Sequence, residues 1–129
     1  MNTAVLLLAE DEALLLPNLE DALAEGGYDT LVVDNGIKAI EELEKDVARF
    51  RGLITDIRMG AGPSGWDVAH RARELSPTIP VIYMTGDSAA DWAANGVPHS
   101  VLLQKPFAMA QLVTAISQLI TQSNSIPPS

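Results

Sequence analysis

The sequence of 129 residues contains no cysteine. This absence excludes a disulfide framework, a thiolate zinc site and a cysteine nucleophile, and it is compatible with a reducing cytoplasm. Aromatic residues make up only 5% of the chain, whereas hydrophobic residues together make up 47%. A chain of this length and composition can therefore form one domain around a core of aliphatic side chains.

Basic residues are scarce: the chain has 8 Lys and Arg against 17 Asp and Glu, which gives a net charge of −9 at pH 7. Proteins that bind a nucleic-acid backbone usually carry the opposite charge, and anionic membrane surfaces repel a negative chain. No apolar run reaches the roughly 18–20 residues of a membrane span, and the first residues lack the basic segment of a signal peptide. We therefore expect no direct contact with nucleic acid or membrane, and a cytoplasmic location.

Short apolar runs alternate along the chain with segments in which apolar residues recur at helical spacing. The runs predict five strands, over residues 5–9, 30–33, 52–55, 80–84 and 100–103. The other segments predict helices over residues 13–25, 37–47, 66–75, 87–95 and 112–120. This alternation predicts an α/β fold with a parallel sheet covered on both faces, in which ligands bind beyond the carboxyl ends of the strands.

Proline residues modify this pattern at two places. Pro17 would lie past the first turn of a helix that begins near Glu12, where it removes a backbone hydrogen bond. We therefore expect a later start of the helix or a distorted first turn. Residues 123–129 are rich in proline and serine, and we expect them to form a flexible tail after a domain that covers residues 1–122.

Polar side chains follow four of the five predicted strands. They are Glu10, Asp11 and Glu12 after the first strand, Asp56 after the third, Thr85 after the fourth and Lys105 after the fifth. Carboxylates that lie together repel one another and favour a divalent cation, and oxygen ligands are the preference of Mg²⁺. A carboxylate that faces a metal-bound phosphate can act as a nucleophile and form an acyl phosphate, whose oxygens a lysine and a threonine can bind.

Each of these residues also has a simpler interpretation when it is taken alone. An aspartate at a strand end, such as Asp56, is typical of a turn or a helix cap. Acidic residues at positions 10–12 favour the start of the following helix, and Thr85 is typical of a turn with an N-cap. Lys105 alone would be a solvated surface lysine. Their joint position at one predicted edge of the sheet favours a phosphoryl-transfer site instead.

Four stretches of the sequence, in their order and spacing, resemble the receiver domain of two-component response regulators such as the chemotaxis regulators. They are Leu7–Glu12, Leu53–Met59, Met84–Gly86 and Lys105–Phe107. The resemblance runs from Val5 to about Ile120, which is nearly the whole chain. It implies a flavodoxin-like, doubly wound fold in which five parallel strands have the order 2-1-3-4-5 and helices cover both faces of the sheet.

The resemblance also implies a phosphoacceptor and a metal site. Asp56 is similar to the aspartate that accepts the phosphoryl group. Glu10 and Asp11 are similar to the acidic pair that binds Mg²⁺, together with Asp56 and the backbone carbonyl of Arg58. Glu12 would lie at the edge of this site, as part of a helix start and not as a metal ligand.

Two further residues of the predicted site are similar to those that contact the transferred group. Thr85 is similar to the hydroxyl residue that turns toward the phosphoryl group, and Lys105 is similar to the lysine that pairs with it. The resemblance implies a cis peptide bond between Lys105 and Pro106, which would fix the direction of the lysine. Gly86 would leave room for a phosphodonor.

The sequence departs from the family pattern in two places near these residues. The loop Met59–Gly65 has Met-Gly where many members have Met-Pro, and it is about one residue longer, so we expect a more mobile loop. Leu102 stands where many receivers have Tyr or Phe. We therefore expect the coupling between Asp56 and the outer face of the fifth strand to be weaker or to use other residues.

Three other residues carry local expectations. Ala108, at the expected start of the last helix, is a poor N-cap. Trp66 and Trp92 are expected to be partly buried packing residues because of their apolar bulk.

The resemblance implies that a histidine kinase or a histidine phosphotransfer protein donates the phosphoryl group. The result would be a shift in the population of conformations that bind another, unknown protein, and the family tends to form homodimers through its fourth and fifth helices. We expect no enzymatic activity beyond Mg²⁺-dependent self-phosphorylation and self-dephosphorylation. The chain leaves no room for an output domain after the last helix, so we expect a stand-alone regulator or a receiver cut from a larger protein.

Two other functions compete with this hypothesis. Leu102 and the Gly-rich loop favour an interaction module that does not depend on phosphorylation, although the complete set of site residues opposes it. A Mg²⁺-dependent phosphohydrolase would need a second acid near Asp56 as general acid or base. The residue two positions on is Arg58, which cannot serve in this role.

Overall fold

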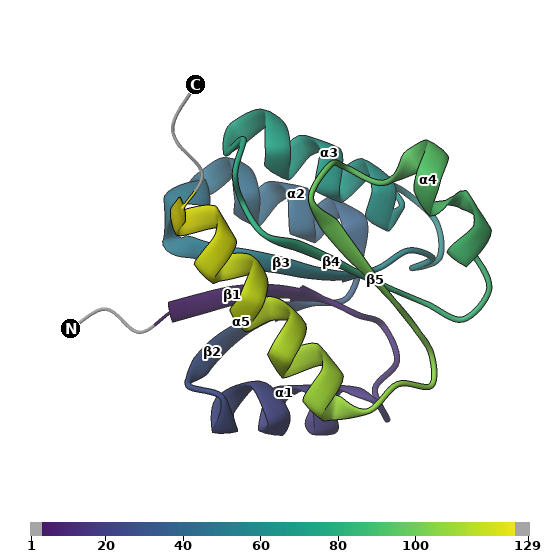
Figure 1. Cartoon of the computed structure of the whole chain (residues 1–129). Helices are drawn as coiled ribbons and strands as arrows, with labels where there is room; N and C mark the ends of the chain where they lie inside the picture. The colour runs from purple at the N-terminus through teal and green to yellow at the C-terminus, as the bar shows by residue number, and fades with distance from the viewer. Residues whose placement is uncertain (1–3, 126–129) are drawn as a thin grey trace.

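The computed structural model describes residues 4–125 and contains a parallel sheet with the strand order β2-β1-β3-β4-β5 (Figure 1). The strands are β1 (Ala4–Ala9), β2 (Tyr28–Val33), β3 (Phe50–Asp56), β4 (Val81–Thr85) and β5 (Ser100–Gln104). All four neighbouring pairs are parallel, so every carboxyl end lies at the same edge of the sheet. The predicted flavodoxin-like fold and strand order are confirmed.

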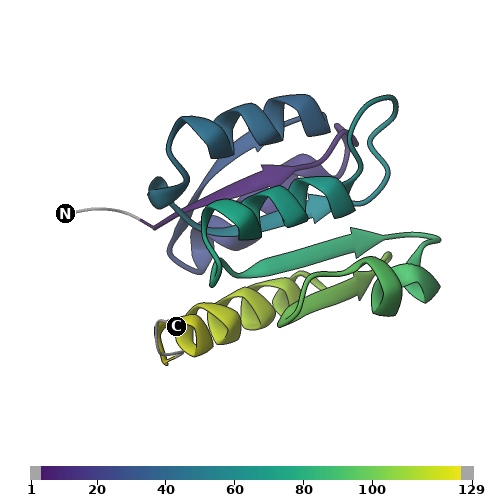
Figure 2. The same ribbon diagram turned by 90° about the horizontal axis from the view of Figure 1, so that it is seen from above.

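Helices cover both faces of this sheet, as predicted. They are α1 (Leu16–Glu25), α2 (Gly36–Lys45), α3 (Gly65–Leu75), α4 (Trp92–Asn95) and α5 (Met109–Ser125), with short 3-10 helices η1 (Val47–Arg49) and η2 (Ala89–Asp91). Figures 1 and 2 show α2 and α3 on one face of the sheet and α1 and α5 on the other. Among residues 4–125, no helix combines the length and the apolar composition needed to cross a bilayer.

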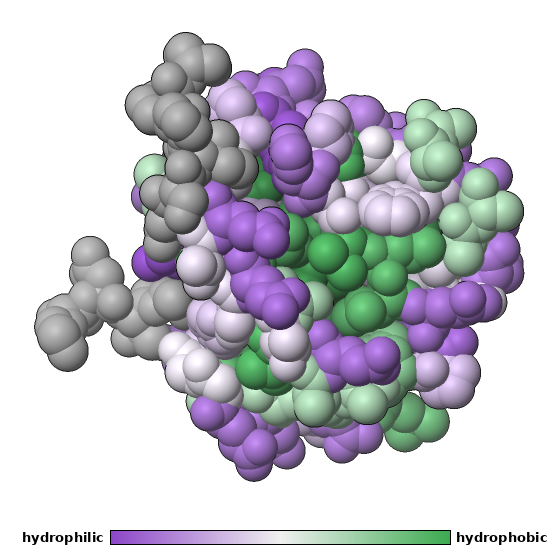
Figure 3. Space-filling model, in the orientation of Figure 1, coloured by the Kyte–Doolittle hydropathy of each residue, from purple (hydrophilic) through white to green (hydrophobic). Residues whose placement is uncertain are grey.

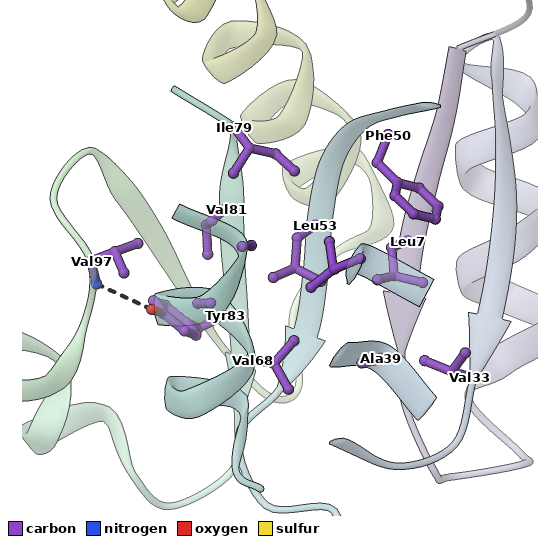
Figure 4. Packing of buried hydrophobic residues seen from close by; sticks show 14 of the residues in the cluster. Leu7, Val33, Ala39, Phe50, Leu53, Val68, Ile79, Val81, Tyr83 and Val97 are labelled. Carbon is purple, nitrogen blue, oxygen red and sulfur yellow. Dashed lines mark hydrogen bonds between the residues drawn. The ribbon is translucent and has the colours of Figure 1, made fainter. Parts of the chain in front are cut away.

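The core has two parts because successive side chains of a strand point to opposite faces. Leu7 of β1 belongs to the cluster under α2 and α3, and its neighbours Leu6 and Leu8 belong to the cluster under α1 and α5. Figure 4 labels ten members of the first cluster: Leu7, Val33, Ala39, Phe50, Leu53, Val68, Ile79, Val81, Tyr83 and Val97. Because the central strands are buried on both faces, their sequences are continuous apolar runs without polar alternation.

Two buried aromatic side chains, Phe50 and Tyr83, belong to the first cluster. Tyr83 of β4 is fully buried, and the half-buried ring of Trp66 packs against it with 4.7 Å between the ring centroids and 57° between the planes. Trp92 is 38% exposed, and its indole Nε1 donates to the Ser100 hydroxyl across 3.0 Å. The predicted partial burial of Trp66 is therefore confirmed, whereas Trp92 lies near the surface.

Pro17 has the effect on α1 that the sequence predicted. The helix begins at Leu16, so Pro17 lies in its first turn, where a backbone N–H needs no partner within the helix. Residues 13–15 form a turn before it. The carbonyl oxygen of Glu12 accepts hydrogen bonds from the backbone N–H groups of Leu15, at 3.0 Å, and Leu16, at 3.3 Å.

The helix predicted over residues 87–95 is shorter than expected. The structure has the 3-10 helix η2 and the single turn of α4 instead. The reason lies at the end of β4, where the hydroxyl of Thr85 accepts hydrogen bonds from the backbone N–H groups of Asp87, at 3.2 Å, and Ser88, at 2.8 Å. These residues therefore form a turn around the Thr85 side chain before the helical segment begins.

Helix α5 differs from the prediction at both ends. Its N-cap residue Ala108 has no side-chain acceptor, but the Gln111 side chain accepts from the Ala108 backbone N–H across 2.9 Å, which is half of a capping box. At the other end the helix continues to Ser125, so the flexible tail predicted from residue 123 is wrong for residues 123–125. The Ser123 hydroxyl donates to the carbonyl of Thr78 across 2.7 Å and holds this last turn. The remaining tail residues, 126–129, lie outside the described residues.

Candidate functional site

Asp56 ends strand β3 at the carboxyl edge of the sheet and is almost fully buried. Its Oδ1 accepts a hydrogen bond from the backbone N–H of Ile57 across 2.8 Å. Its Oδ2 lies 3.2 Å from the ammonium nitrogen of Lys105. One carboxylate oxygen is thus fixed by the backbone, and the other faces a cation at the sheet edge.

Two acidic residues after β1 lie beside Asp56. Strands β1 and β3 are neighbours, with Ala9 opposite Thr55, so Glu10 follows its strand at the level of Asp56. Glu10 is fully buried and Asp11 is exposed. Carboxylate oxygens of Glu10, Asp11 and Asp56 lie within 4.8 Å of one another. Three clustered carboxylates, one of them open to solvent, fit a Mg²⁺ ion that keeps part of its water shell.

Lys105 lies among the carboxylates of three residues. Its Nζ atom is 3.1 Å from Glu10 Oε2, 3.0 Å from Glu12 Oε2 and 3.2 Å from Asp56 Oδ2. The backbone N–H of Lys105 donates to the carbonyl of Thr85 across 2.7 Å, and its peptide bond with Pro106 is cis, as predicted. The contact with Glu12 was not predicted, because the sequence indicated only a helix start there.

Burial changes the acid–base properties of this cluster. It raises the pKa of Glu10 to about 6; the charge of Asp56 adds to this effect, while the Glu12 backbone N–H and Lys105 oppose it. Burial also raises the pKa of Asp56, against the effect of Lys105. Burial by itself would lower the pKa of Lys105, but the hydrogen bonds to Glu12 and Glu10 and the nearby negative charges outweigh it and raise that pKa. The single positive charge of Lys105 therefore does not balance the negative charges of the three carboxylates that it contacts.

Thr85 ends strand β4 next to this cluster and is 1% exposed. Its hydroxyl oxygen is the acceptor for the two N–H groups of the following turn described above. A Cβ added at Gly86 would meet no described atom within 4 Å, so the space beside this residue is open. The predicted Thr85 and Lys105 thus both lie at the carboxyl edge, on neighbouring strands.

Arg58 lies in the loop after β3, and its side chain contacts the loop after β4. Its Nε atom is 3.2 Å from Asp87 Oδ1 and donates to the Ser88 hydroxyl across 3.1 Å. This link between two loops was not predicted, since nothing in the local sequence pairs residues 58 and 87. The role of the Arg58 carbonyl as a metal ligand stays a prediction.

The loop between Arg58 and α3 closes tightly on the end of β3. The backbone N–H of Gly65 donates to the carbonyl of Ile57 across 2.8 Å. A Cβ at Gly65 would collide with the carbonyl oxygen of Asp56, so only glycine fits there. Gly60 and Gly62 have φ angles of 79° and 98°, a conformation that glycine adopts readily.

Apolar side chains flank the acidic cluster on the side of Lys105. We call Leu14, Leu15, Phe107 and Met109 the apolar rim. Leu14 is 93% exposed, and the other three line an open hollow together with Glu12, Lys105 and Pro106. Exposed apolar side chains that lie together, as in this rim, are candidates for a surface that contacts another molecule.

Comparison with known proteins decides the family. The family model described as the response regulator receiver domain matches residues 6–117. This chain belongs to that family. It is a receiver domain of a two-component system, as the sequence motifs indicated.

Known receiver proteins resemble this receiver domain over most of its length. The response regulator receiver protein CpdR of Brucella abortus is 32% identical over 117 residues, which cover 89% of this chain and 95% of CpdR. The transcriptional regulatory protein TctD of Salmonella typhimurium is 32% identical over 92% of this chain, but the match spans only 52% of TctD. A crystal structure of a response regulator receiver protein from Sinorhizobium medicae has 46% identity and a TM-score of 0.90, and covers 94% of this chain and 97% of that one.

This receiver domain departs from many members of its family at Leu102. Leu102 lies opposite Tyr83 in the sheet and packs against the cluster under α2 and α3. The large buried aromatic ring of this region therefore belongs to β4 and not to β5. The weaker coupling expected from Leu102 stays a prediction.

Proposed function

We propose that Asp56 accepts a phosphoryl group from a histidine kinase or a histidine phosphotransfer protein. The observation that carries this proposal is the position of the Asp56 carboxylate, which lies within reach of the Glu10 and Asp11 carboxylates on one side and of the Lys105 ammonium on the other. An oxygen of Asp56 attacks phosphorus while the bond from phosphorus to the donor histidine nitrogen breaks, and an acyl phosphate forms.

A Mg²⁺ ion bound by Glu10, Asp11, Asp56 and the Arg58 carbonyl would neutralise charge on the oxygens of the transferred group. Lys105 is close enough to Asp56 to donate a hydrogen bond to that group. Thr85 can donate its hydroxyl proton to another of its oxygens. Receiver domains generally bind Mg²⁺ at such an acidic pocket, which supports the assignment of the metal to these residues.

The Thr85 hydroxyl connects this chemistry to a change of shape. It accepts two backbone hydrogen bonds from Asp87 and Ser88. When the hydroxyl turns toward the phosphoryl group, these two N–H groups lose their acceptor, and the turn before η2 has to rearrange. Phosphorylation would thus shift the population of conformations of the segment from residue 86 to α4.

The apolar rim supports a protein as the phosphodonor. Leu14 is almost completely exposed, and the rim lies beside Lys105, close to the acceptor. A partner that carries its phosphohistidine on a helix could bury these side chains while it presents the phosphoryl group to Asp56. Apolar contacts of this kind would supply affinity, which the charges of the acidic site do not.

A second face supports binding of a downstream protein or of a second copy through α4 and α5. Between residues 88 and 129 the only charged residues are Asp91 and Lys105. Figure 3 shows hydrophobic side chains at the centre of this face, over the edge strand β5, where Val101, Leu102 and Leu103 are half-buried. A chain with a net charge of −9 meets a second copy with the least repulsion through this nearly uncharged face.

The proposal includes no turnover of a separate substrate, only the Mg²⁺-dependent phosphorylation and dephosphorylation of Asp56, and it includes the cytoplasmic location predicted from the sequence. Arg58, the residue two positions after Asp56, is engaged with Asp87 and cannot act as a general acid or base. Substantial hydrolysis of a generic phosphate monoester by the chain would favour a phosphohydrolase instead.

The test is incubation with Mg²⁺ and acetyl phosphate followed by intact-mass measurement. The expected result is the added mass of one phosphoryl group, which is lost in the Asp56→Asn variant and when EDTA removes the metal. If the wild-type chain stays unmodified while a control receiver is phosphorylated, the proposal fails. The alternative of an interaction module independent of phosphorylation, which Leu102 favours, would then remain.

A further inference from the structure

The ammonium group of Lys105 has no donor left for a phosphoryl group. An ammonium carries three N–H donors, and three carboxylates, those of Glu10, Glu12 and Asp56, lie within 3.2 Å of the Nζ atom. Lys105 must therefore release one of these partners before it can donate to a phosphoryl oxygen on Asp56. The partner that is released most easily is the carboxylate whose charge is best solvated without the lysine.

Glu10 is costly to release. It is fully buried, and its other oxygen, Oε1, already accepts a hydrogen bond from the Glu12 backbone N–H across 3.0 Å. In the metal-free chain, its Oε2 without Lys105 would be a buried charge with no hydrogen-bond partner among residues 4–125. Asp56 carries the phosphoryl group itself, so the donor that it receives from Lys105 can pass to one phosphoryl oxygen. Any further contact of Lys105 with that group needs a donor now given to Glu10 or Glu12.

Glu12 is the partner that can leave. Its side chain is 59% exposed, so water can replace the lysine at little cost. It is also outside the group of carboxylates that could hold a metal ion, so binding of Mg²⁺ does not draw it away from Lys105. Its backbone is fixed on both sides, because its N–H donates to the Glu10 carboxylate and its carbonyl accepts from the N–H groups of Leu15 and Leu16.

We propose that Glu12 is a positioning residue that holds Lys105 in the unphosphorylated chain and competes with the phosphoryl group for one lysine donor. This inference rests on the proposed phosphorylation of Asp56. Glu12 thereby lowers the affinity of the site for a phosphoryl group, both by occupying Lys105 and by adding negative charge. A Lys105 ammonium that turns fully toward the phosphoryl group does so at the expense of its contact with Glu12.

Two substitutions at residue 12 separate contact from charge. Glu12→Gln removes the charge and keeps the size of the side chain. Glu12→Asp keeps the charge but shortens the side chain by one methylene, which withdraws the carboxylate from Lys105. The probe is beryllofluoride with Mg²⁺, a mimic of the bound phosphoryl group, and its dissociation constant is measured by titration calorimetry.

Both variants are expected to bind beryllofluoride about two- to fivefold more tightly than wild type, the range that an exposed ion pair contributes. Tighter binding by Glu12→Gln alone would assign the effect to charge and overturn the competition for a donor. Unchanged or weaker binding by both variants would overturn the proposal as a whole.

A second measurement needs neither metal nor phosphodonor. Relaxation of the ammonium ¹⁵N signals by NMR reports how firmly each lysine is held, with Lys38 and Lys45 as internal references that pair with Asp34 and Glu42. Both variants should increase the mobility of Lys105 alone, and an unchanged Lys105 would overturn the proposal. If wild type fails to bind beryllofluoride although this change at Lys105 is seen, the failure lies with the phosphorylation of Asp56 and not with the Glu12 contact.

Discussion

The hydroxyl of Tyr83 accepts a hydrogen bond from the backbone N–H of Val97 across 3.1 Å (Figure 4). This bond joins β4 to the segment between α4 and β5. Arg73 of α3 fixes the same segment, because its guanidinium donates to the carbonyl oxygens of Pro98 and His99. The segment that leads into β5 is therefore fixed by side chains of β4 and α3, in a receiver domain that has leucine at the usual aromatic position of β5.

Tyr83→Phe should destabilise the chain, because it leaves the buried N–H of Val97 without its acceptor. We expect a loss of about 1–2 kcal/mol in the free energy of unfolding, measured by urea denaturation. Faster hydrogen exchange at Val97 should accompany it. Tyr28→Phe is the matched control, since the Tyr28 hydroxyl shares a hydrogen bond with the Ser117 hydroxyl in a partly buried place and its loss should cost less. Equal losses for both variants would contradict the role of Tyr83.

The stability of the metal-free chain should fall as the pH rises from about 4.5 to about 6. The pKa of Glu10 is raised to about 6 from the usual 4.5, so in this window the folded state binds a proton that the unfolded state has released. The stabilisation is complete below the unfolded pKa and is lost through the folded one, a change on the order of 2 kcal/mol. Denaturation at several pH values measures it, and Glu10→Gln should flatten this part of the profile.

The same proton should govern metal binding. Mg²⁺ requires the ionised carboxylate, so its affinity should fall by about tenfold for each pH unit below 6 and stay nearly constant above it. Calorimetric titration with Mg²⁺ between pH 5 and pH 8 is the measurement. A pH-independent affinity over this range would show that Glu10 is not a ligand.

Asp56→Asn should stabilise the metal-free chain. Burial raises the pKa of Asp56, which means that the fold favours its neutral form, and the amide removes one of the carboxylates crowded around Lys105. We expect a higher free energy of unfolding for the variant, and saturating Mg²⁺ should reverse the difference because it stabilises wild type more. Asp34→Asn, at an exposed ion pair with Lys38, is the control and should change stability little.

Leu14→Ala should separate the protein phosphodonor from the chemistry. Leu14 is 93% exposed, so its truncation should leave stability and phosphorylation by acetyl phosphate unchanged. Phosphotransfer from a histidine kinase or phosphotransfer protein should become at least severalfold slower, as followed by radiolabel transfer. Ile37→Ala, on α2 and 56% exposed, is the matched control and should transfer at the wild-type rate. Equal rates for both variants would place the partner elsewhere.

The sequence predicted the strands and the residues of the site from local signals. Apolar runs that end in Asp56 or Thr85 mark both a buried strand and the polar residue at its carboxyl end, so one pattern led to both predictions. Contacts between separate loops had no such signal. The pairing of Glu12 with Lys105 joins residues 93 positions apart, and it depends on how the segments that follow β1 and β5 meet at the carboxyl edge of the sheet.

The errors have a related cause. The shortened fourth helix results from the Thr85 hydroxyl, which takes two N–H groups that helical periodicity alone would assign to the helix. The extension of α5 results from the Ser123 bond to Thr78, across 45 positions. Composition suggested a loose tail there, because serine and proline are common in such segments, but a single tertiary contact fixes the last turn.

Because the stretch from residue 88 onward is nearly uncharged, the charge of the molecule is unevenly distributed. The charges of Asp91 and Lys105 cancel, so the whole net charge of −9 belongs to residues 1–87. The electric field therefore has a direction: it attracts cations and basic partners toward the first three helices and exerts little force on a partner that approaches β5. Added salt would slow the first kind of encounter and leave the second almost unchanged, so ionic strength alone could distinguish the two kinds of partner.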